Sequence, residues 1–197
     1  MIYCSLKRIL AHRKTYTAFI DHLIREFSFE NLLCVTEMMQ YRTLYAQLLI
    51  VNQEHSSVPV LVRLPLNNPS FPQSRIVFNN HFTKDDERVT AQCIEYVVKA
   101  LLSKYVVSGC ELQVNLAHAM RQTYEALLWL HVSHFEQMLS KNIRDVVTIF
   151  DPIIKQLLGL MSDSFSRFSH KPEFEKCMAY IEEREKDAAS GDGDGHA

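Results

Sequence analysis

The sequence predicts an all-α fold of six to nine helices with no sheet. Helix-breaking residues are scarce in its 197 residues, with 5 Gly and 6 Pro, and four of the prolines lie before residue 73. Elsewhere apolar residues recur at intervals of three and four, the spacing of one helix face. An apolar fraction of 47% and a charged fraction of 22% are ordinary for a globular domain with a core.

The first two helical segments surround a short polar turn. Residues 5–25 are expected to be helical with a break near His12 to Lys14. The residues with helical spacing are Leu6, Ile9, Leu10, Phe19, Leu23 and Ile24. Ser28 is a candidate N-cap, since its hydroxyl can accept a hydrogen bond from the amide of Asn31. The next helix is expected over about 29–51.

Residues 53–82 differ in composition from the rest of the chain. They contain four prolines and two Asn-Asn pairs. A long segment of this kind is uncommon inside a compact domain and is usually functional or mobile. We therefore interpret residues 53–82 as an inserted loop.

Helical patterns return after this loop. A helix is expected from Thr83, its N-cap, to about Val107, where Ser108-Gly109 ends it. A long stretch over 116–143 has a wide apolar face, and a further helix is expected over 148–161.

The C-terminal end divides into two segments. An amphipathic segment after Pro172 is expected to form a helical extension at 176–187. Residues 188–197 contain Gly-Asp-Gly-Asp-Gly and are expected to be a disordered tail.

Charge and cysteine usage exclude several classes of protein. The net charge of −2 favours neither nucleic-acid binding nor a direct anionic-membrane role. No apolar run reaches the ~18 residues of a membrane span, and basic residues precede any long apolar run, so no secretory signal is expected. Five scattered cysteines without a Cys-x-x-Cys pair indicate a reduced cytoplasmic chain.

One weak pattern suggests a metal-dependent enzyme. His131 and His134 have the i, i+3 spacing of helix residues that share a ligand, and Glu136 is near. A third and a fourth ligand are not evident, and a partly buried His131 on the apolar face is the simpler interpretation. Cys110 has no neighbouring histidine to act as a base. We therefore expect no cofactor, no metal and no catalytic residue.

Three separated blocks resemble the RGS family, the regulators of G-protein signalling. The first runs from Ser5-Leu6 through Ala18-Phe19 to Glu26-Phe27-Ser28 and Glu30-Asn31-Leu32. The second is Val114-Asn115-Leu116, with Arg121 six residues after the asparagine. The third contains Phe150-Asp151, Leu160-Met161, Asp163-Ser164-Phe165 and Arg167-Phe168. The resemblance implies an RGS-like bundle of about nine helices, in which an antiparallel four-helix bundle is joined to a terminal subdomain, here over residues 1–175.

The resemblance also implies a function. Members of the family bind the GTP-bound α subunit (Gα) of a heterotrimeric G protein and accelerate its GTP hydrolysis, which ends the signal. The catalytic residues belong to Gα, which carries an arginine in its own active site and a glutamine that orients the attacking water. The RGS surface holds the switch regions of Gα in their transition-state shape, and such differential binding lowers the barrier. We therefore expect a cytoplasmic protein, with recruitment to the inner face of the plasma membrane through this partner.

The matched positions imply a set of Gα-binding residues. An asparagine in the second block both donates and accepts hydrogen bonds, so it can position the catalytic glutamine of Gα and its water. An arginine in the third block would brace Asp163 or Glu30 from behind. The full set is Glu26, Ser28, Glu30, Asn31, Asn115, Leu160, Asp163, Ser164 and Arg167.

Several departures from the family pattern support an alternative function. Phe29 replaces a common acidic residue, and Asp163 is one residue closer to Met161 than usual. Additional residues between Arg121 and Phe150 imply an extended sixth helix at about 122–145. The alternative is an RGS-like interaction scaffold without GTPase-activating activity. The resemblance does not specify which Gα subunit is the partner, and the sequence does not specify the oligomeric state.

Overall fold

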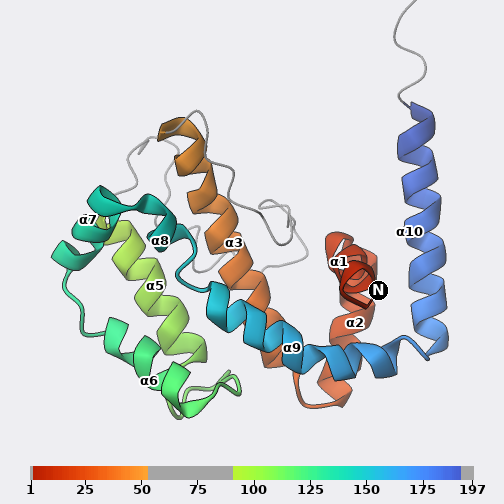
Figure 1. Cartoon of the computed structure of the whole chain (residues 1–197). Helices are drawn as coiled ribbons and strands as arrows, with labels where there is room; N and C mark the ends of the chain where they lie inside the picture. Colours follow the sequence, from red (N-terminus) through yellow and green to blue (C-terminus); the bar gives the residue numbers. More distant parts are fainter. Residues whose placement is uncertain (1, 53–90, 192–197) are drawn as a thin grey trace, which may run out of the picture. The chain divides into compact units, whose positions relative to one another are not determined.

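The structure, a computed structural model, describes residues 2–52 and 91–191 (Figure 1). Every regular element in these two ranges is a helix, and they contain no strand. The predicted all-α class is therefore confirmed for this part of the chain. None of the helices in these ranges has the length and apolar character needed to cross a membrane. The inserted loop at 53–82 and the N-cap at Thr83 lie outside the described residues.

The chain forms two compact units, which we describe separately. Unit 1 combines residues 1–29 with residues 160–197, and unit 2 comprises residues 30–159. The domain predicted over 1–175 takes in unit 2 and part of unit 1, and it stays a prediction.

Unit 1 contains α1 (Ile2–Ala11), α2 (Arg13–Arg25), the end of α9 (Asp151–Phe168) and α10 (Pro172–Gly191). α10 packs on α1 and α2. The break predicted near residues 12–14 is confirmed, and it lies at His12. An aromatic cluster forms the core, with ring centroids 5.3–6.4 Å apart. Its members are Phe19, His22, Phe165, Phe168 and Phe174.

Unit 2 contains α5 (Ala91–Tyr105), α6 (His118–Leu127), α7 (Val132–Lys141), α8 (Ile143–Val147), most of α3 (Phe29–Asn52) and the start of α9. α7 packs on α5 and α8 (Figure 1). Two tyrosine hydroxyls tie the segment before α9 into this core. Tyr41 donates to the carbonyl of Val146 at 2.9 Å, and Tyr124 donates to that of Ile149 at 2.7 Å.

The predictions of a long helix over 116–143 and of an extended sixth helix at about 122–145 are wrong. The structure has α6, α7 and α8 instead. His131 caps α7 by accepting a hydrogen bond from the amide of Ser133, and Asn142 caps α8 by accepting one from the amide of Arg144 at 3.1 Å. The two side chains satisfy amides that an uninterrupted helix would have paired internally. His131 is therefore exposed and does not lie on a buried apolar face.

The helix expected over 148–161 is displaced in the structure. α9 begins at Asp151 and continues to Phe168, so Asp163 and Ser164 lie inside the helix and not beyond its end. The apolar spacing explains the continuation, because Met161, Phe165 and Phe168 follow at intervals of four and three and are all buried.

Two further expectations need correction. α10 reaches Gly191, so residues 188–191 are helical and not part of a disordered tail, while 192–197 lie outside the described residues. The hydroxyl of Ser28 has no hydrogen-bond partner among the described residues, so Ser28 does not cap α3 through its side chain.

Candidate functional site

Glu26 is the centre of a polar cluster in unit 1. It is the C-cap residue of α2, and Arg167 of α9 binds its carboxylate through two parallel hydrogen bonds. The distances are 2.6 Å from Nε to Oε1 and 2.8 Å from Nη2 to Oε2. These hydrogen bonds are the main cause that lowers the pKa of Glu26 to about 2, against the opposing effect of partial burial. Glu26 is therefore a fixed negative charge.

Two more side chains complete this cluster. His22 is buried, and its Nε2 lies 3.2 Å from the carbonyl oxygen of Ser164 and 3.3 Å from Oε1 of Glu26. Arg167 Nη2 also donates to the hydroxyl of Ser164 at 3.1 Å. The cluster thus joins the end of α2 to the last turns of α9. Arg167 takes Glu26 as its carboxylate partner, and not Asp163 or Glu30 as the resemblance implied.

His22 was not among the predicted site residues. Its position one turn before Glu26, between the core residues Phe19 and Leu23, was the available signal. A histidine on an apolar helix face is usually a core residue, and His22 is also that, because its ring packs on Phe19 and Phe168.

The turn after Glu26 presents an aromatic residue to solvent. Phe27 has a φ of 53° and is 90% exposed. A left-handed conformation at a bulky residue costs about 1–3 kcal/mol and persists where the surroundings fix it. Here the amide of Ser28 closes the end of α2 by donating to the carbonyl of Leu23 at 3.0 Å. The strained backbone at Phe27 thus leaves its phenyl ring open to solvent on the turn between α2 and α3.

Glu30 and Asn31 lie in the first turn of α3, in unit 2. Desolvation raises the pKa of Glu30 above its ordinary value. Asn31 is only 7% exposed, and its Oδ1 is buried without a hydrogen-bond partner among the described residues. Asn31, which the resemblance implied as a Gα-binding residue, is therefore largely buried, and its substitution is not expected to leave the fold unperturbed.

Asn115 lies in the connection between α5 and α6, and its side chain is exposed. Arg121 of α6 holds this connection at two points, because it donates to the carbonyl of Val106 at 2.8 Å and to that of Val114 at 2.9 Å. The amide of Val114 in turn donates to the carbonyl of Tyr105 at 2.9 Å. In the second matched block Asn115 is thus exposed to solvent, whereas Arg121 fixes the backbone that carries it.

The remaining predicted residues lie on α9 in unit 1. Leu160 and Asp163 are exposed and three residues apart, so they share one helix face. Ser164 is buried by the contacts described above. The structure therefore brings together Glu26, Ser164 and Arg167.

The described residues do not support a metal or thiol site. They contain no group of three or more His, Cys, Asp or Glu side chains that could hold a metal ion. Desolvation raises the pKa of the Cys110 thiol, which is the opposite of what activates a cysteine nucleophile.

Comparisons of the chain with protein-family models, with curated proteins and with solved structures find no match.

Proposed function

We propose that this chain is a GTPase-activating protein for the α subunit of a heterotrimeric G protein, built on an RGS-like helical bundle. The observation that carries the proposal is the ion pair between Glu26 and Arg167. It links two sequence blocks, 141 residues apart, that independently resemble the same family. A structural pair is expected between such blocks if both belong to one recognition surface.

The geometry of the pair suits a docking role. Each carboxylate oxygen has two lone pairs, so Glu26 can still accept hydrogen bonds from a partner after binding Arg167. Because the guanidinium fixes both oxygens, little side-chain entropy is lost when a partner binds. The exposed ring of Phe27, next in the chain, offers an apolar contact beside this charge.

Asn115 supplies the second part of the proposal. Its exposed amide stands on a backbone segment that Arg121 holds at two carbonyls. In the proposed complex this amide would orient the catalytic glutamine of Gα and the attacking water, without adding charge. A rigid support favours the transition-state geometry over the ground state, and each ~1.4 kcal/mol of that preference is worth about tenfold in rate.

A single-turnover GTP hydrolysis assay tests the proposal. The chain should accelerate hydrolysis by at least one Gα subunit and should bind its aluminium-fluoride form more tightly than its GDP form. Asn115→Ala should reduce the acceleration by about a hundredfold, a typical loss for one positioned polar group. Gln137→Ala removes an exposed amide on α7 and is the matched control.

The alternative function is an interaction scaffold without GTPase-activating activity. One observation favours it, namely that the segment which departs from the family pattern carries Trp129 with 87% of its surface exposed. Exposed tryptophans often anchor protein interfaces. Binding to activated Gα without faster hydrolysis, abolished by Trp129→Ala, would favour the scaffold over the activator.

A further inference from the structure

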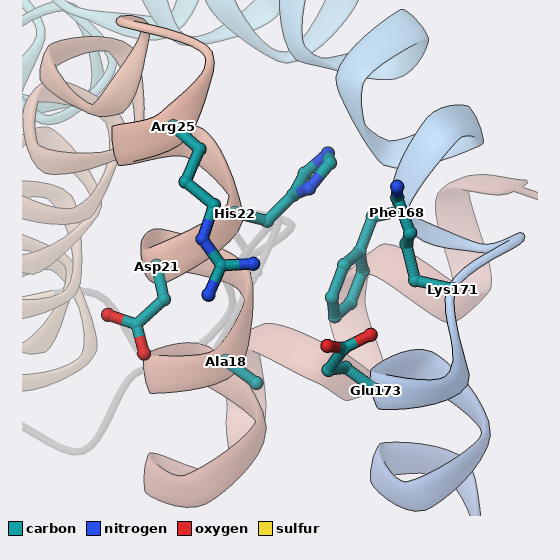
Figure 2. Close-up of a pocket in the computed structure, with 7 residues that line it drawn as sticks. All are labelled: Ala18, Asp21, His22, Arg25, Phe168, Lys171 and Glu173. Carbon is teal, nitrogen blue, oxygen red and sulfur yellow. The ribbon is translucent and has the colours of Figure 1, made fainter.

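A pocket in unit 1 has a cavity volume of about 190 Å³ and lies beside the polar cluster (Figure 2). Four of its residues come from α2, and the others come from the end of α9, from the connection that follows it and from α10. The lining residues are Ala18, Asp21, His22, Arg25, Phe168, Lys171 and Glu173.

The pocket is lined by charges of both signs. Arg25 and Lys171 supply two cations, and Asp21 and Glu173 supply two carboxylates. Within residues 2–52 and 91–191, none of these four side chains forms a hydrogen bond or an ion pair, although they line one cavity. Figure 2 shows the side chains of Asp21, His22 and Arg25 extending from one helix, α2, and those of Phe168, Lys171 and Glu173 on the segments that line the rest of the pocket. Charges of opposite sign that remain apart are available to a ligand that carries both signs.

We propose that this pocket binds a small zwitterion in which a phosphate lies next to a primary ammonium group. Arginine and lysine together are typical phosphate ligands, through charge-assisted hydrogen bonds. The two carboxylates can accept hydrogen bonds from an ammonium group. An ion of a single sign would leave two lining groups facing a like charge, which disfavours its binding. The Phe168 ring and Ala18 provide an apolar wall for the carbon atoms between the two charged groups.

The pocket is separate from the proposed docking residues but shares one wall with them. His22 lines the pocket, and its Nε2 contacts the carbonyl of Ser164 and the carboxylate of Glu26. The zwitterion site does not rest on the proposed function, because none of the Gα-binding residues lines it. Binding in the pocket is therefore measured without Gα.

Isothermal titration calorimetry with O-phosphoethanolamine tests the site. Inorganic phosphate and ethanolamine are the two half-ligands. O-phosphoethanolamine should bind at least about tenfold more tightly than either half, since it engages both pairs of charges. Arg25→Gln and Glu173→Gln should each weaken binding by about fivefold or more, because each removes a charged hydrogen-bond partner. All four charged lining residues are exposed, so these variants should fold, as thermal unfolding by circular dichroism will check.

Matched controls use exposed residues on the same helices. Arg13→Gln changes an arginine at the other end of α2, and Glu175→Gln changes a glutamate of α10 outside the pocket. Neither substitution should alter the affinity. Equal losses in the control variants would overturn the assignment, because they would indicate general charge attraction.

The other outcomes each overturn the proposal in a defined way. If phosphate binds as tightly as O-phosphoethanolamine and Glu173→Gln strengthens binding, the pocket is an anion site. If ethanolamine binds as tightly and Arg25→Gln strengthens binding, it is a cation site. Absence of binding at millimolar concentrations rejects the site altogether.

A vesicle arm identifies the source of the zwitterion. Sedimentation with phosphatidylcholine vesicles that contain phosphatidylethanolamine, compared with phosphatidylcholine alone, tests a lipid headgroup. Vesicle binding that Arg25→Gln abolishes would assign the lipid. Calorimetric binding of O-phosphoethanolamine without vesicle binding would assign a free metabolite. Both results support the same ligand chemistry.

Discussion

Two arginine–carboxylate pairs, one in each unit, behave differently although their chemistry is the same. In unit 1 Arg167 binds Glu26 with a side chain that is 58% exposed. In unit 2 Arg42 binds Asp151 at 2.6 Å with a side chain that is 4% exposed. The pKa of Glu26 is lowered to about 2, whereas the pKa of Asp151 is raised. The sign of the shift therefore does not follow from the presence of an arginine.

The balance between hydrogen bonding and desolvation of the carboxylate accounts for the difference. Two hydrogen bonds from Arg167 outweigh the small desolvation of Glu26, while the desolvation of Asp151 outweighs the effect of Arg42. A buried pair holds two helices together and is expensive to break. A half-exposed pair contributes little stability but keeps a charge at the surface in a fixed orientation. We therefore interpret the Arg42 pair as structural and the Arg167 pair as a recognition element.

The largest stability effect is expected in the core beneath the unit 1 pair. Phe19 is fully buried and packs on Phe165 and Phe168. Phe19→Ala should lower the free energy of unfolding by about 3–5 kcal/mol, because it leaves a cavity in the aromatic cluster. Urea denaturation followed by circular dichroism measures this. A loss below about 1 kcal/mol would mean that the cluster repacks freely.

The unit 2 pair should come next. Arg42→Ala leaves Asp151 half-buried without its cation, and it should lower the free energy of unfolding by about 3 kcal/mol. Arg144→Ala, at an exposed arginine of α8, is the control and should change it by less than about 0.5 kcal/mol. Similar values for Arg42→Ala and Arg144→Ala would mean that the Arg42–Asp151 pair contributes no more stability than an exposed arginine.

Direct titration of the carboxyl groups by nuclear magnetic resonance should separate the pairs further. Glu26 should titrate near pH 2, so the stability it contributes is complete above its ordinary pKa of 4.5 and is lost as the pH falls towards 2. Asp151 should titrate above its ordinary 3.8, so its contribution is lost as the pH rises through the raised value. In Arg167→Ala the pKa of Glu26 should return towards 4.5. Equal shifts in one direction for both groups would contradict our interpretation.

The smallest stability effect is expected at the unit 1 pair itself. Arg167→Ala should lower the free energy of unfolding by about 1 kcal/mol or less, because the pair is exposed and screened. Urea denaturation of Arg167→Ala and Arg42→Ala under the same conditions compares the two losses of unfolding free energy. A loss as large as that of Arg42→Ala would make both pairs structural.

The helices were more predictable than the connections between them. α2 and α3 followed from apolar spacing that extends over several turns. The division of this region into α6, α7 and α8, where one helix was expected over 116–143, depends on His131 and Asn142. Their capping roles require a local backbone geometry that periodicity does not encode.

The candidate site was predictable in its residue types but not in its pairing. The matched blocks singled out Glu26 and Arg167 but implied a different partner for the arginine. The burial of Asn31 and the contacts of His22 depend on packing between residues distant in sequence. Such contacts cannot be obtained from the local pattern.

The single-turnover rate of GTP hydrolysis by Gα, with the parent chain and with Arg167→Ala, tests most directly whether the Glu26–Arg167 pair holds a surface that activates Gα. We predict that the parent chain accelerates hydrolysis and that Arg167→Ala, although folded, has lost most of the effect. No acceleration with any Gα subunit, or equal acceleration by the parent and the variant, would contradict the account.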